Sequence, residues 1–94
     1  MRAATPVITA VVLISAEKGA IPKLGEDLAA IPGVSEVYSV TGEFDFIAMV
    51  RAKQHDELAD IVTGRIAQTK GVARTHTHVA FRAYSKHDLE TLFG

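Results

Sequence analysis

The chain has 94 residues and a formal net charge of −1, with ten Lys and Arg against eleven Asp and Glu. It contains no cysteine and no tryptophan, and 48% of its residues are hydrophobic. This length allows one packed domain, and the hydrophobic content is too high for a disordered segment. The balanced charge gives no support to binding of nucleic acid or of a membrane surface. Without cysteine, a disulfide framework, a thiolate nucleophile and a cysteine zinc site are excluded.

The N-terminal segment allows two interpretations. Arg2, an apolar run and small residues after it resemble a short secretory signal peptide. Residues 7–14 (VITAVVLI) are also a β-branched run, which is typical of a buried strand. We favour the strand, because a later segment repeats its pattern. No stretch approaches the roughly 20 apolar residues that span a membrane, so a cytoplasmic location is expected.

Helical and alternating patterns predict the remaining elements. Apolar residues spaced by three and four mark two helices, and β-branched or alternating runs mark three further strands. In chain order the prediction is a helix over 20–30, strands over 34–40 and 44–51, a helix over 54–68 and a strand over 72–84. Ser85-Lys86-His87-Asp88 resembles a capping box, which predicts a short helix in the tail, residues 85–94.

The strand-helix-strand order occurs twice. Gly33-Val34 and Gly71-Val72 each end a helix and start a strand, at an offset of 38 residues. Two such units predict an α+β, ferredoxin-like βαββαβ fold, in which a four-stranded antiparallel sheet carries both helices on one face. Residues 7–14 and 44–50 are apolar on both sides, so the face without helices also needs cover. A second copy of the sheet would supply it, which predicts a homodimer of the dimeric α+β barrel type.

The hairpin sequence VTGEFDF, residues 40–46, places two carboxylates around a glycine turn. Solvated acids beside a tight turn are the simplest interpretation. Asp45 is less easily explained, because Asp is poor in strands and alternation places it beside Ile47 and Met49. A carboxylate among apolar neighbours is expected to have a partner, such as a backbone N–H, an arginine or a ligand amine.

The last predicted strand carries two polar sets. Arg74, His76 and His78 project to one side, and Thr75 and Thr77 to the other. The two imidazoles could reach one metal ion, but a zinc site needs further ligands, so a solvated or interface side is the favoured interpretation. The threonine hydroxyls could bind a ligand carboxylate or a backbone group. No P-loop, GxGxxG, HExxH or nucleophile–base set is visible, so neither catalysis nor a cofactor is expected.

These features together resemble the effector-binding domain of the Lrp/AsnC (feast/famine) transcription regulators, the RAM (regulation of amino-acid metabolism) domain. The chain is expected to be a single domain, residues 1–94, and the resemblance covers residues 6–84. Its most specific part is a paired motif, G-x-x-D followed by G-V-x-x-T-x-T, here Gly42 and Asp45, then Gly71, Val72, Thr75 and Thr77.

The resemblance implies dimers joined through facing sheets, and rings of four or five dimers (an octamer or a decamer). It implies clefts between dimers that bind a free amino acid or a related metabolite. Asp45 would then meet the amino group of the ligand, and the threonines its polar end. The candidate ligand-binding residues are Gly42, Glu43, Asp45, Thr75 and Thr77.

Regulators of this family carry a helix-turn-helix before the domain, whereas here a strand is expected from Val7. The chain therefore resembles the stand-alone version of the domain, and direct DNA binding is not expected. The leading hypothesis is a non-catalytic amino-acid sensor that acts through its own assembly or by docking to a full-length Lrp/AsnC regulator.

Two alternatives remain open. One is a small facing-sheet enzyme, such as a cofactor-free monooxygenase or a haem-related protein, for which His76, His78 and Tyr38 are the plausible recruits. The other is a pure assembly module with empty clefts.

Overall fold

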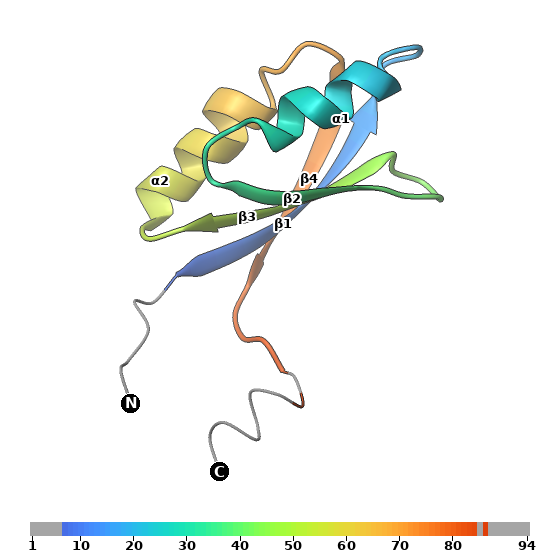
Figure 1. The fold of residues 1–94 in the computed structure, drawn as a ribbon. Coiled ribbons are helices and arrows are strands. Elements are labelled where there is room, and N and C mark those ends of the chain that lie inside the picture. The colour runs from blue at the N-terminus through green and yellow to red at the C-terminus, as the bar shows by residue number, and fades with distance from the viewer. Residues whose placement is uncertain (1–6, 85, 87–94) are drawn as a thin grey trace.

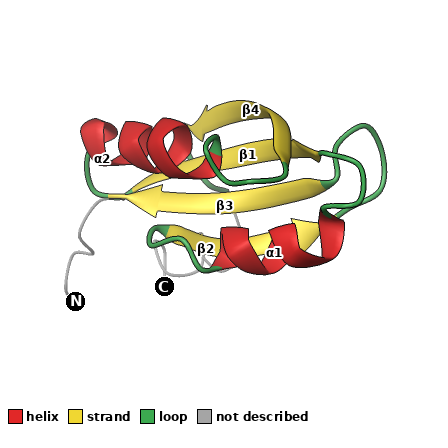
Figure 2. Cartoon of the chain, turned by 90° about the horizontal axis from the view of Figure 1, so that it is seen from above, coloured by secondary structure: helices red, strands yellow, loops and turns green. Residues whose placement is uncertain are grey.

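The computed structural model describes residues 7–84 and residue 86. The elements are, in chain order, β1 (Ile8–Ala16), α1 (Ile21–Ala29), β2 (Val34–Ser39), β3 (Phe46–Ala52), α2 (His55–Ala59), the π-helical segment η1 (Asp60–Ile66) and β4 (Val72–Ala80). The strands form one antiparallel sheet in the order β2-β3-β1-β4. All the helical segments lie on one side of it (Figure 1, Figure 2). The predicted ferredoxin-like fold is confirmed.

Several strand ends differ from the prediction, and β3 begins at Phe46 instead of residue 44. β1 continues to Ala16, because Ser15 still pairs with Arg74 of β4 and the register shifts only after it. β4 ends at Ala80, which is the register partner of Thr9 near the start of β1. β1 begins only one residue before Thr9, so residues 82–84 have no neighbouring strand to pair with. The helix predicted in residues 85–94 lies outside the described residues.

The second predicted helix is only partly α-helical. After α2 the chain continues as η1, in which the Ala67 N–H donates to the Val62 carbonyl at 2.9 Å, five residues back. The Thr63 hydroxyl donates to the Ala59 carbonyl at 2.7 Å, so a side chain also uses the carbonyls of this segment. Apolar spacing cannot distinguish an α-helix from a single π-helical segment, because both bury one stripe.

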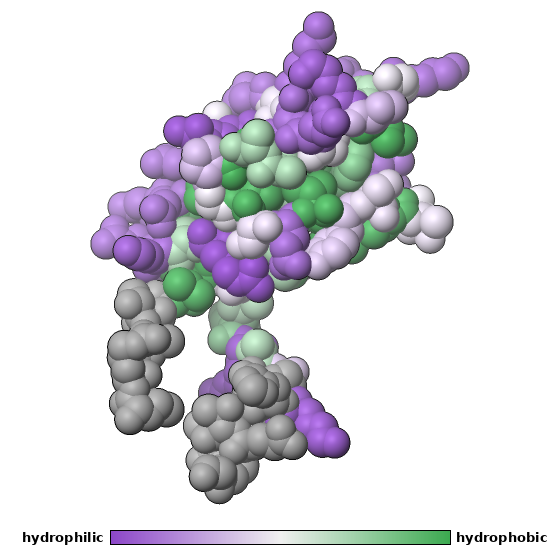
Figure 3. All heavy atoms as spheres, in the orientation of Figure 1, coloured by the Kyte–Doolittle hydropathy of each residue, from purple (hydrophilic) through white to green (hydrophobic). Residues whose placement is uncertain are grey.

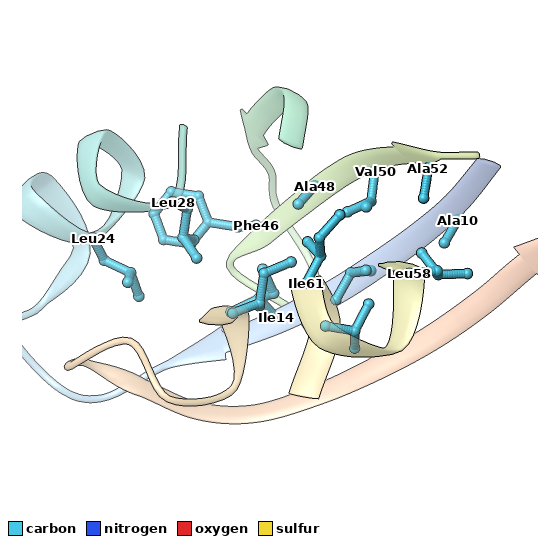
Figure 4. Close-up of a cluster of buried hydrophobic side chains, with 13 residues drawn as sticks. Ala10, Ile14, Leu24, Leu28, Phe46, Ala48, Val50, Ala52, Leu58 and Ile61 are labelled. Carbon is cyan, nitrogen blue, oxygen red and sulfur yellow. The ribbon is translucent and has the colours of Figure 1, made fainter. Parts of the chain in front are cut away.

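The hydrophobic core lies between the sheet and the helices (Figure 4). Alternate residues of β1 and β3 supply its floor, with Val12 opposite Ala48 and Ile14 opposite Phe46. The core residues are Ala10, Val12, Ile14, Leu24, Leu28, Phe46, Ala48, Val50, Ala52, Leu58, Ile61, Val62 and Ile66. Among the residues that the structure describes, no helix is long and apolar enough to cross a membrane.

The other side of the sheet, here called the open face, carries no helix from residues 7–84. Its centre is apolar, with Val11 opposite Met49 and Leu13 opposite Ile47. These four side chains are neither fully buried nor fully exposed. The expectation that both sides of the sheet are apolar therefore holds, and the described part of the chain covers only one of them with helices.

Candidate functional site

The two halves of the paired motif meet at one end of the sheet. Oδ2 of Asp45 accepts a hydrogen bond from the Ala16 N–H at 2.7 Å. The next amide, that of Glu17, donates to the Gly71 carbonyl at 2.7 Å. Two consecutive amides at the end of β1 are therefore held by the hairpin before β3 and by the loop before β4. Residues far apart in sequence are thus joined through one short stretch of main chain.

The partner of Asp45 is a backbone N–H, one of the three kinds expected. Asp45 also donates its own N–H to the Ile14 carbonyl at 2.9 Å, although Phe46 is the register partner of Ile14. Two successive residues therefore oppose one residue of β1, as in a β-bulge. The simple alternation that would group Asp45 with Ile47 does not run through this point. Among the described residues the bond engages only Oδ2, which leaves Oδ1 for a second donor.

The turn of the hairpin is exposed. Gly42 has φ +111°, a conformation that side-chain-bearing residues rarely adopt. A Cβ at Gly42 would meet no atom within 4 Å, so the space beside the turn is open. The side chain of Glu43 is exposed as well. The hairpin residues that were predicted to approach a ligand are therefore accessible.

The two candidate threonines lie on the side of β4 that faces the helices. Thr75 is the register partner of Ile14 and Thr77 of Val12, and both partners are core residues. β1 separates β4 from β3, so the threonines lie two strands from β3, roughly 10 Å across the sheet. Within one chain the structure groups the hairpin candidates together and places the threonine pair apart from them.

A cleft of about 430 Å³ opens at the same end of the molecule. It is formed by the loop after β1, the first turns of α1 and the loop before β4, and it carries charges of both signs. Of the motif residues, Gly71 lines it. Its lining residues are Glu17, Lys18, Gly19, Ala20, Lys23, Leu24, Asp27, Lys70 and Gly71. From the sequence pattern, the α1 residues that line this cleft were expected to form only a solvated helix face. Gly71 of the paired motif was the one sequence signal that pointed to the cleft.

Charged groups lie at both edges of the open face, and the Glu36 carboxylate on β2 lies 3.8 Å from the guanidinium of Arg51 on β3. On β2, the Tyr38 hydroxyl donates to the carboxylate of Glu36. This hydrogen bond, reinforced by the negative charge of Glu36, raises the pKa of Tyr38 above its usual value. On β4, His76 and His78 are the register partners of Leu13 and Val11, so they belong to the open face.

His76 and His78 share one side of β4, two residues apart. Among the described residues there is no group of three or more His, Cys, Asp or Glu side chains that could hold a metal ion.

The family model of the Lrp/AsnC ligand binding domain matches residues 9–89. This match spans most of the chain, and it agrees with the fold and with the paired motif at one end of the sheet. The chain therefore belongs to the Lrp/AsnC ligand-binding domain family, a family of transcription regulators, as the resemblance implied.

Individual relatives agree with this assignment. The chain is 51% identical to TTHA0845 from Thermus thermophilus, whose crystal structure matches with a TM-score of 0.78 over 84% of this chain and 99% of that one. A feast or famine regulatory protein from M. tuberculosis, solved in complex with L-methionine, is 30% identical, with a TM-score of 0.70 over 84% of this chain and 54% of that one. An uncharacterised HTH-type transcriptional regulator from Pyrococcus furiosus is 42% identical over 59 residues, which are 63% of this chain and 39% of the regulator. The chain spans about half or less of the length of the curated regulators it matches.

Proposed function

We propose that this chain is a non-catalytic sensor of a free amino acid or a related small metabolite. Binding changes its own assembly or its docking to a full-length Lrp/AsnC regulator. The observation that carries the proposal is the convergence of both motif segments on Ala16 and Glu17, beside an exposed turn and a cleft of mixed charge. A zwitterion needs groups of both signs, and this end of the molecule supplies them.

The proposed site lies between copies of the chain. Asp45 offers Oδ1 and Glu43 offers an exposed carboxylate to the ammonium group of a ligand. Thr75 and Thr77 lie too far across the sheet to contact the same small ligand from within one chain. A ligand held by the hairpin of one copy and by β4 of another satisfies both sets. Its occupancy would then be coupled to assembly.

The open face supports the first step of that assembly, a homodimer through facing sheets. Val11, Leu13, Ile47 and Met49 form its apolar centre. If β2 of one copy lies over β4 of the other, the acidic edge at Glu36 meets the basic edge at Arg74, His76 and His78. The opposite orientation would bring like edges together, which costs free energy.

A second apolar surface supports assembly beyond the dimer. A groove of about 350 Å³ runs between α1 and β2 and is lined largely by Ile21, Pro22, Ala29, Val37 and Phe46. Hydrophobic surface gathers around α1 and β2 in the middle of the view in Figure 3. Contacts there would join dimers into the octamer or decamer that the family resemblance implies.

Relatives that carry the HTH-type name suggest the partner in transcription. A full-length regulator presents a domain of the same fold, so mixed assembly would transmit the state of the sensor without any DNA contact by residues 7–84. This mode of action requires a shared compartment, which we propose to be the cytoplasm.

The test is light scattering coupled to size exclusion, with and without a pool of free amino acids, followed by titration calorimetry with each amino acid. A ligand-dependent change in mass and a measurable heat for at least one amino acid are expected. No heat at millimolar concentration for any of them, with an unchanged mass, would refute the proposal.

The threonines can be tested separately. Thr77→Val keeps the shape of the side chain and removes its hydroxyl, and should weaken binding about tenfold by the loss of one hydrogen bond. Thr63→Val on η1 is the matched control, because the Thr63 hydroxyl bonds within its own helical segment. Equal affinity of both variants would remove Thr77 from the site.

A further inference from the structure

Phe44 lies between the two carboxylates of the hairpin, and its ring reaches the open face. The ring centroid is 5.2 Å from that of His76, with the planes tilted by 58°. The guanidinium carbon of Arg74 lies 5.6 Å from the same ring centroid. His76 is the register partner of Leu13, which places this contact on the open face. The ring therefore spans β1, from the hairpin to β4.

The bulge at Asp45 explains this direction. Regular alternation would give Phe44 the same side as Phe46, which is a core residue. Because Asp45 and Phe46 both oppose Ile14, the alternation shifts by one before Phe46. Phe44 then points away from the helices. The local backbone therefore directs the apolar side chain of Phe44 across the open face instead of into the core.

A buried polar atom lies next to this contact on the open face. Ser15 is the register partner of Arg74, next to the Phe44 contact. Its hydroxyl oxygen is buried and has no hydrogen-bond partner among the described residues. Burial of a polar atom without a partner costs free energy. The contacts of the Phe44 ring with His76 and Arg74 are favourable and lie beside it.

Few other contacts hold the hairpin. Thr41, Gly42 and Glu43 are exposed. The Val40 N–H donates to the Asp45 carbonyl at 3.0 Å, and Asp45 in turn holds the Ala16 amide. Among the described residues, the hairpin makes a side-chain hydrogen bond through Asp45 toward β1 and ring contacts through Phe44 toward β4.

We propose that Phe44 is a positioning residue that clamps the hairpin to β4 through His76 and Arg74. Thr75 lies between those two residues and Thr77 follows His76, so the clamp also sets the separation between Asp45 and the threonines. The consequence for ligand binding rests on the proposed function. The clamp itself does not, because it can be measured without a ligand.

The experiment compares Phe44→Leu, which keeps an apolar side chain without a ring, with Phe44→Tyr, which keeps the ring. Phe81→Leu is the matched control, since the same substitution is made at a fully exposed side chain. Hydrogen exchange of the Ala16 amide reports the Asp45 bond, and the amide of Val12 in the centre of β1 reports global stability. Phe44→Leu should speed exchange at Ala16 about tenfold relative to Val12, by the loss of the ring contacts.

Phe44→Tyr and Phe81→Leu should leave the ratio of the two exchange rates within about twofold of the wild type, since both keep the ring at position 44. An unchanged ratio in Phe44→Leu overturns the proposal, as does an equal loss in Phe44→Tyr. Where the wild type binds an amino acid, Phe44→Leu should also weaken that binding about tenfold, with rescue by Phe44→Tyr. A wild type that binds no amino acid rejects the proposed function, and the exchange ratio still decides the clamp.

Discussion

At the scale of single residues, Asp45 has a structural role that sequence alone left open. Its carboxylate takes the Ala16 N–H at the point where the pairing of β1 becomes irregular. A carboxylate that accepts from a main-chain amide makes a charge-assisted bond, which is stronger than one between neutral groups. A role in ligand binding would therefore add to this structural role, and the two must be separated by experiment.

Asp45→Ala should lower the free energy of unfolding by about 1–3 kcal/mol, because the Ala16 amide loses its acceptor. Asp45→Asn keeps an acceptor oxygen and should cost less. Glu43→Ala, at an exposed carboxylate of the same turn, should stay within about 0.5 kcal/mol of the wild type. Urea denaturation followed by circular dichroism at one protein concentration measures all three. Equal losses for Asp45→Ala and Glu43→Ala would contradict the assigned role of Asp45.

Glu36→Gln should lower the pKa of Tyr38 toward its ordinary value. In the wild type the neutral phenol donates to the carboxylate and the phenolate would be repelled by it, so both effects raise the pKa. Ultraviolet absorbance of tyrosinate measures the midpoint, in a Tyr84→Phe background that leaves Tyr38 as the single tyrosine of a chain without tryptophan. An unchanged midpoint would show that Glu36 does not act on Tyr38 in solution.

At the scale of elements, glycine is required at the two motif positions for different physical reasons. Gly42 and Gly71 have φ +111° and +100°, where other residues are strained. A Cβ at Gly71 would also lie 2.9 Å from the Ala20 Cβ, whereas one at Gly42 would meet nothing. The Ala20 Cβ cannot rotate away, because it is fixed to the main chain. Gly71 therefore serves both the turn and the close approach of the loops before α1 and β4.

Gly42→Ala should cost about 1–2 kcal/mol, from the backbone conformation alone. Gly71→Ala should cost roughly 1–3 kcal/mol more, because overpacking is added to it. The comparison is internally controlled, since both substitutions add one methyl group at a positive φ. Chemical denaturation measures the difference, and equal costs would mean that the loops separate without penalty.

At the scale of the whole molecule, the helices cover one face of the sheet, and the proposed dimer would cover the other. Leu13→Lys places a charge at the centre of the open face, where Leu13 pairs with Ile47 and His76. The proposed facing-sheet dimer should dissociate into a monomer of about 10.1 kDa by light scattering. Thr63→Lys, at an exposed position of η1, should leave the mass unchanged. A dimer that survives Leu13→Lys would place the interface elsewhere.

Sequence by itself determined the order of elements and the core. Period-2 alternation in the strands and the apolar stripes of the helices report burial directly, and the repeat at an offset of 38 residues fixed the topology. The paired motif likewise identified the family. These features are local or periodic, so pattern alone can show them.

Only the tertiary structure decided which neighbours each polar group has. The bulge that turns Phe44 onto the open face, the π-helical turns of η1 and the bond from Ala16 to Asp45 all depend on atoms distant in sequence. A one-residue shift in a strand exchanges the two sides of the sheet, and no propensity reports such a shift. For this reason the hairpin could be recognised from its sequence motif. The separate structural roles of Asp45 and Phe44 became visible only from their contacts with β1 and β4.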